Sequence, residues 1–161
     1  MPLRRPGSAL HPRLGRSRGR GPVFTVRDDF QQLAAIRVRE ARVLLDGGCP
    51  DGAYCLCGYA IECALKAVIA KQTREFDFPA KDRVNASYAH DPPRLLRVAG
   101  LDGELELQRL GDPAFRDNWN LVVDWSERAR YGRSSQGVAQ ELYKAVTDPS
   151  SGVLTWLQGH W

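Results

Sequence analysis

Hydrophobic residues recur along this chain at the three- and four-residue spacing of helices, and no segment sustains the alternation of a β-strand. The first series predicts an amphipathic helix over residues 26–45, which Gly47 and Gly48 end. The second predicts a helix over residues 52–72, introduced by Pro50, and it is the most strongly marked element of the chain. The first half of the sequence is therefore expected to form two long helices.

The second half predicts shorter helices separated by glycine, proline and aspartate. In chain order we expect an irregular connection over residues 73–90, short helices over 92–99 and 102–110, a longer helix over 112–131, a helix over 134–148 that packs Val138, Leu142 and Val146, and a last short one over 153–157. Trp119 and Trp125 are interpreted as core residues rather than as stacking platforms for bases. The expected fold is all-α, with four main helices packed as antiparallel neighbours and additional short helices.

The second helix carries charges among apolar and small residues. Its core stripe is formed by Tyr54, Cys57, Ile61, Leu65 and Val68, and Gly58 would permit close approach of a neighbouring element. At 100° per residue, one polar strip beside that stripe holds Cys55, Tyr59, Glu62 and Lys66. Glu62 and Lys66 form an i,i+4 pair in the favourable order. The strip is either a surface ion pair that aids solubility or one wall of a binding site.

Charge is distributed unevenly along the chain. The formal net charge is +4, but six of the 23 basic residues lie in the first 21 positions, which contain no acid. The rest of the chain holds 17 basic and 19 acidic residues. We expect residues 1–22 to be a disordered extension rich in Arg, Gly and Pro, and residues 23–161 to be one helical domain. General affinity for nucleic acid would then lie in the extension.

Several classes of protein are disfavoured by the sequence. No apolar run of a signal peptide follows the basic residues, and no stretch of about 18 apolar residues predicts a membrane span, so we expect a cytoplasmic protein without membrane contact. Four cysteines lie within fifteen residues around one helix, which is not a disulfide framework. Cys55 and Cys57 would point about 200° apart on a helix and cannot ligate one zinc ion. We expect no metal and no cofactor.

Four segments, taken in order, resemble the HEPN superfamily of small helical domains. They are DGAYCLCGYAIECALKAVIAK, YAHDPPRLLRVAGL, NWNLVVDWSERARYG and DPSSGVLTWLQGHW. The resemblance spans nearly all of residues 29–161. It implies a four-helix up-and-down bundle, often a homodimer, and commonly a partner of the nucleotidyltransferase type. In active members of the family, a cleft between protomers cuts RNA without a metal ion.

The chain departs from the family at the signature of the active members. That signature is an arginine followed, four to six residues later, by a histidine near the start of the last main helix. The corresponding residues here, 127–140, contain Arg128, Arg130 and Arg133 but no histidine. Arg83 and His90 show the literal spacing, but they lie in the connection after the second helix and are interpreted as a chance match. Arginine can hold a phosphate, but it stays protonated and is a poor proton carrier.

The candidate site residues follow from the strip and from the resemblance. His90 either orders the turn into the next helix or faces Glu62, whose carboxylate would then fix the orientation of its ring. Tyr131 either caps the end of the bundle or works with Arg130 on a phosphate or a base. The candidates for catalysis are His90, Arg130 and Tyr131. The candidates for substrate binding are Glu62, Lys66, Arg128 and Arg130.

Three functions remain open at this point. The first is a HEPN-like module that acts through a homodimer or a nucleotidyltransferase-type partner, in a toxin–antitoxin or defence setting, with a site for a nucleotide or RNA phosphate. The second is a metal-independent ribonuclease of toxin type with a non-standard active site. The third is a non-catalytic helical scaffold. The missing histidine distinguishes the first function from the second. RNA cleavage needs groups that take up and return protons, and the residues at the signature position do not include the histidine that active members use.

Overall fold

The computed structural model describes residues 27–73 and 80–161, and every regular element within these ranges is helical. The elements are α1 (Arg27–Asp46), α2 (Pro50–Gln72), α3 (Lys81–Ser87), α4 (Pro92–Val98), α5 (Asp102–Gly111), α6 (Pro113–Val123), the 3₁₀ helix η1 (Glu127–Tyr131), α7 (Gln136–Thr147) and α8 (Val153–Gln158). The predicted all-α class is confirmed. The extension predicted for residues 1–22 lies outside the described residues.

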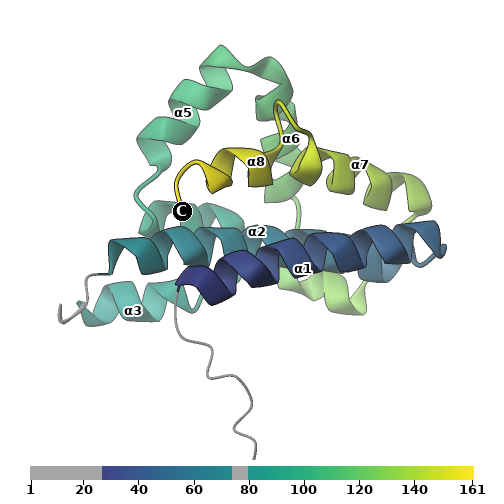
Figure 1. Cartoon of the computed structure of the whole chain (residues 1–161), viewed down its shortest axis with the longest axis horizontal. Coiled ribbons are helices and arrows are strands. Elements are labelled where there is room, and N and C mark those ends of the chain that lie inside the picture. The colour runs from purple at the N-terminus through teal and green to yellow at the C-terminus, as the bar shows by residue number, and fades with distance from the viewer. Residues whose placement is uncertain (1–26, 74–79) are drawn as a thin grey trace, which may run out of the picture.

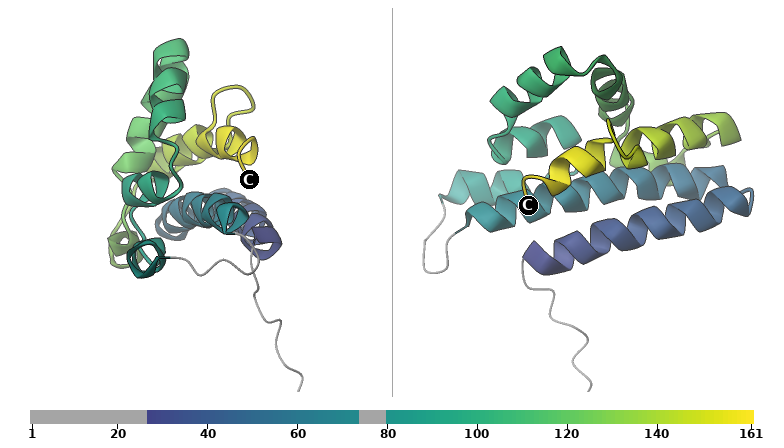
Figure 2. Two further views of the ribbon diagram at one scale, coloured as in Figure 1. Left: turned by 90° about the vertical axis from the view of Figure 1, so that its left-hand side faces the viewer. Right: turned by 45° about the horizontal axis from the view of Figure 1, so that its top comes forward.

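The long helices α1 and α2 run antiparallel, side by side, along the length of the molecule (Figure 1). A turn at Gly47 and Gly48 joins them, and Gly48 adopts a positive φ of 71° that favours glycine. Helices α7 and α8 pack on α2, while α5 and α6 rise above this layer (Figures 1 and 2). Helix α2 is therefore covered by several neighbours, as its apolar circumference predicts.

The core lies around α2. Cys57, Ile61, Leu65 and Val68 of the predicted stripe are all buried, whereas Tyr54 is partly exposed. Gly58 is buried against the indole ring of Trp125, and a Cβ atom placed there would lie 2.0 Å from that ring. The close approach predicted at Gly58 is thus made by an aromatic ring from the segment between α6 and η1.

Helix α2 also has the length and apolarity needed to cross a membrane, which differs from our expectation that no segment does. Its most apolar 18-residue window is 61% buried inside the protein. A core helix covered on several sides meets the same requirements. The composition of α2 is therefore weak evidence for a membrane span.

The irregular connection predicted for residues 73–90 is partly wrong. Residues 81–87 form the helix α3, while residues 74–79 lie outside the described ranges. No side chain of α3 is buried, so the helix shows no apolar periodicity that sequence reasoning could detect.

The single helix predicted over residues 112–131 is also wrong, because the chain breaks after Val123. Helix α6 ends there, Ser126 is extended with φ −143° and ψ 163°, and η1 follows. The break directs Trp125 into the core, where its side chain is buried.

Helix α7 begins as predicted, but one of its expected core residues is not buried. The Ser135 hydroxyl caps the helix by accepting a hydrogen bond from the Val138 backbone N–H at 3.2 Å. Leu142 is buried as expected, whereas Val138 is 47% exposed and the neighbouring Ala139 is buried in its place. The apolar face of α7 therefore lies one residue away from the predicted stripe at this end.

Candidate functional site

Glu62 is the only charged side chain that is buried among the described residues. Its Oε1 atom accepts a hydrogen bond from Lys66 Nζ at 2.8 Å and lies 3.0 Å from His90 Nδ1. The Lys66 side chain is mostly buried, while that of His90 is 46% exposed. We refer to these three residues as the Glu62 cluster. It joins two of the predicted binding residues to one of the predicted catalytic ones.

The helical repeat of α2 brings Glu62 and Lys66 together, because residues four apart lie on one face. His90 comes from the turn between α3 and α4, 28 residues further along the chain. The cap of α4 is made by Asp91, whose side chain accepts from the Arg94 N–H at 3.2 Å, and Pro92 opens the helix. The His90 ring therefore does not take part in the cap, and it contacts Glu62 instead. Of its two predicted placements, His90 adopts the one beside Glu62.

The contact with Glu62 fits one tautomer of His90 best. A carboxylate oxygen accepts hydrogen bonds, so in this contact Nδ1 would donate to Glu62 Oε1. In the neutral imidazole, Nε2 is then the unprotonated nitrogen and can accept a proton. A buried carboxylate that fixes an imidazole in this way is the arrangement used to orient a general base.

The second carboxylate oxygen of Glu62 has no partner in the structure. Glu62 Oε2 is buried and accepts no hydrogen bond from residues 27–73 or 80–161. An unsatisfied buried carboxylate oxygen is costly, and such atoms are found where a site is incomplete without a water or a ligand. The cluster therefore has an unused acceptor next to a lysine and a histidine.

The rest of the polar strip continues along α2 from Glu62 towards its N-terminus. Burial raises the pKa of the Tyr59 hydroxyl, and the Arg130 guanidinium opposes that shift. Burial likewise raises the pKa of the Cys55 thiol, again opposed by Arg130. Arg130 therefore lies close to this end of the strip. The structure brings it to Cys55 and Tyr59 rather than into contact with Glu62.

All three predicted residues of η1, Arg128, Arg130 and Tyr131, are exposed. Tyr131 is 83% exposed, and the Arg130 guanidinium carbon lies 5.1 Å from the centre of its ring. Arg128 is exposed and makes no hydrogen bond or ion pair with any described residue of the Glu62 cluster. Arg133 binds Asp51 at 3.1 Å and so holds the loop before α7 to the start of α2.

The coincidental spacing of Arg83 and His90 does not bring the two together at one site. Arg83 Nη2 donates to Gln72 Oε1 at 2.6 Å, whereas His90 contacts Glu62. Ten residues of α2 separate these two contacts, which is about 15 Å along the helix axis. The spacing is therefore a chance match, as interpreted from the sequence.

One cation beside the strip was missed by sequence reasoning. Arg37 of α1 lies close enough to Cys63 for its charge to lower the pKa of that thiol, although burial dominates and raises it to about 11. The i,i+4 rule finds pairs within a helix, but Arg37 reaches the strip only because α1 packs beside α2. The strip is thus flanked by cations from α1, α2 and η1.

Metal and thiol chemistry have little support at this site. Within the described ranges, no group of three or more His, Cys, Asp or Glu side chains is placed to hold a metal ion. All four cysteines are free, and burial raises the pKa of Cys57 to about 12. Cys57 and Cys63 are therefore protonated at neutral pH and poor nucleophiles. What the cluster can do is bind an anion or move a proton.

Comparisons of the chain with models of known protein families, with curated proteins and with solved structures found no match.

Proposed function

We propose that this protein is a HEPN-like helical module that binds a nucleotide or RNA phosphate at the Glu62 cluster. It would act as a homodimer or with a nucleotidyltransferase-type partner, in a toxin–antitoxin or defence setting. The observation that carries the proposal is the buried Glu62 carboxylate held by Lys66 and His90. A buried carboxylate held by a lysine and a histidine, with an unused acceptor, is unusual in a helix that otherwise forms the core.

The arrangement of cations supports a phosphate ligand. Residues 55 to 66 of α2 span about 16 Å along the helix axis. Lys66 and His90 lie towards one end of this strip and Arg130 towards the other. Cations at both ends, with the Tyr59 hydroxyl between them, suit a short piece of single-stranded backbone or a nucleotide.

The four-helix up-and-down arrangement is part of the same proposal. Helices α1, α2, α6 and α7 are the longest described helices, and α7 packs on each of the other three. They would form the bundle, with α3, α4, α5, η1 and α8 as additions. The partly exposed polar strip of α2 would then face a second protomer or a partner protein.

The test of phosphate binding uses single-stranded RNA carrying a fluorophore and the full-length chain. Lys66→Gln with Arg130→Gln should weaken binding at least tenfold and reduce its dependence on salt, because two phosphate contacts are lost. Lys144→Gln, an exposed lysine of α7, should bind as the parent does. Equal losses of RNA affinity in the double variant and in Lys144→Gln would show that binding depends on general charge and not on the strip.

The partner part is tested separately. Sedimentation of the purified protein should give a dimer, or purification from the native source should yield a second protein in equal amount. A monomer that brings no second protein with it and binds no RNA would leave only the scaffold function. A monomer that does bind RNA would retain the site and reject the partner.

A metal-independent ribonuclease is the second candidate, and the contact between His90 and Glu62 favours it. His90 Nε2 would take the proton of a ribose 2′-hydroxyl, and O2′ would attack the adjacent phosphorus. The 5′-oxygen would leave with a proton from a second group, for which Tyr131 is the candidate. Lys66 and Arg130 would offset the charge that develops on the phosphate.

This second candidate predicts RNA cleavage in the presence of EDTA, with 2′,3′-cyclic phosphate ends. His90→Gln should abolish cleavage, whereas His160→Gln, which removes a ring packed on Trp156, should not. Cleavage that survives His90→Gln would reject His90 as the base. Cleavage that survives Arg130→Ala would reject Arg130 as the phosphate-binding residue.

A further inference from the structure

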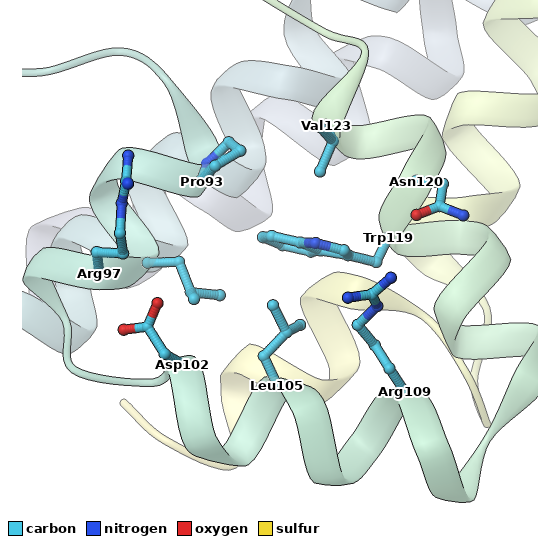
Figure 3. Close-up of a pocket in the computed structure, with 9 residues that line it drawn as sticks. Pro93, Arg97, Asp102, Leu105, Arg109, Trp119, Asn120 and Val123 are labelled. Carbon is cyan, nitrogen blue, oxygen red and sulfur yellow. The ribbon is translucent and has the colours of Figure 1, made fainter.

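A cavity lies between α4, α5 and α6, and it shares no residue with the Glu62 cluster. Its volume is about 380 Å³, within the range of pockets that hold small ligands. The side chains around it are shown in Figure 3. None of them was identified as a candidate from the sequence.

The inner wall of the cavity is apolar and contains one large flat ring. Trp119 lies across the cavity and is 4% exposed, with Leu96 and Leu105 beside it (Figure 3). Pro93 and Val123 extend this apolar surface to the mouth. Such a wall favours a ligand with a flat apolar body that can lie against an indole.

The polar side chains around the cavity are mostly cationic or hydrogen-bonding. Arg97 comes from α4, Arg109 from α5 and Asn120 from α6, while Asp102 at the start of α5 is the only acid in the lining. Arg97 and Asp102 lie on one side of the cavity and Arg109 lies on the other (Figure 3).

Arg109 carries the strongest indication of a ligand. One of its terminal nitrogens donates to Glu106 Oε1 at 2.8 Å, but its Nε is buried and meets no acceptor within residues 27–73 or 80–161. A guanidinium has five N–H donors in a planar fork that matches a carboxylate or a phosphate. Arginine cannot relieve an unpaired donor by losing its proton. An acid group of a ligand would supply the missing acceptors.

We propose that this cavity binds a small organic anion, with its acid group on Arg109 and its flat ring on Trp119. Asn120 and Asp102 then bind hydrogen-bonding groups on the ring or next to it. Nucleoside monophosphates and aromatic carboxylic acids both have this chemistry. The cavity and the Glu62 cluster are separate sites, so this inference does not depend on the function proposed above.

The test titrates the full-length, ¹⁵N-labelled protein with nucleoside monophosphates, with aromatic carboxylates and with inorganic phosphate. We expect saturable binding of one organic class, a shift of the Trp119 indole N–H signal, and much weaker binding of phosphate alone. The organic class that saturates identifies the ligand. No saturable Trp119 shift at several millimolar of any probe, or phosphate binding as tightly as the organic anions, would overturn the proposal.

Two variants and one control make the test specific. Arg109→Gln should weaken binding about tenfold or more, because a charged hydrogen bond is lost while the alkyl stem stays. Val123→Glu places a repelling charge at an exposed position on the mouth and should weaken binding without affecting the core. Arg116→Gln, on the same helix as Trp119 but outside the lining, should bind normally. Equal losses in Arg109→Gln and Arg116→Gln would overturn the assignment.

Discussion

Glu62 shows how much one buried residue depends on its neighbours. A carboxylate taken out of water is costly unless donors replace the lost hydration. Here Lys66 and His90 supply two donors to one oxygen, and the other oxygen is left without one among the described residues. The hydrogen bonding of the Glu62 carboxylate is therefore incomplete among the described residues.

Glu62→Ala should lower the free energy of unfolding by about 2 kcal/mol, because it leaves the mostly buried Lys66 ammonium without its acceptor. The matched control is Asp46→Ala, which removes an i,i+4 partner of Arg42 where both side chains are about 60% exposed. That change should cost less than about 1 kcal/mol. Urea unfolding of both variants measures the difference, and equal costs would contradict a buried pair.

At the scale of the element, α2 is a core helix that also carries the polar strip. Its apolar and small residues meet α1, α7 and α8, while the strip is partly exposed at every residue except the buried Glu62. Gly58 shows how closely this helix is approached, since the Trp125 ring occupies the space of a side chain there. The segment that carries Trp125 lies between the end of α6 at Val123 and the start of η1.

Gly58→Ala should destabilise the protein by about 3 kcal/mol, because the new methyl group would overlap a buried indole. Gly103→Ala in α5 is the matched control, since its methyl group would meet nothing within 4 Å. It should be neutral or stabilising by up to about 1 kcal/mol. Thermal unfolding compares the two, and a harmless Gly58→Ala would show that the ring does not sit as described.

At the scale of the whole molecule, burial of thiols links stability to pH. Burial raises the pKa of Cys57 from its ordinary value of 9.0 to about 12, and that of Cys63 to about 11. Below about pH 9 both thiols are protonated in the folded and in the unfolded chain. Between pH 9 and 12 the unfolded chain loses protons that the folded chain keeps, so stability falls as pH rises.

The urea midpoint should therefore fall between pH 8 and pH 10. Cys57→Ala should be less stable at pH 8, because it leaves a small cavity, but it should lose less stability on going to pH 10. Cys49→Ser, at an exposed position, should keep the pH dependence of the parent. The same pH dependence in Cys57→Ala would show that the Cys57 thiol does not contribute to it.

Much of the fold follows from local sequence patterns. The apolar repeats of α1, α2 and α8 and the proline and glycine signals around α4 and α5 predict these helices to within a residue or two. Helix α3 could not be found in this way because it buries nothing. The break after α6 could not be found from local patterns. Trp125, which follows the break, packs on Gly58, a residue 67 positions earlier in the chain.

By itself, the sequence determined the all-α class, the polar strip of α2 and the pairing of Glu62 with Lys66, because helical periodicity and i,i+4 spacing are local properties. Only the tertiary structure decided that His90 binds Glu62, that Arg37 and Arg130 flank the strip, and that α4, α5 and α6 enclose a cavity around Trp119. These contacts join distant parts of the chain, and packing rather than any local pattern brings them together.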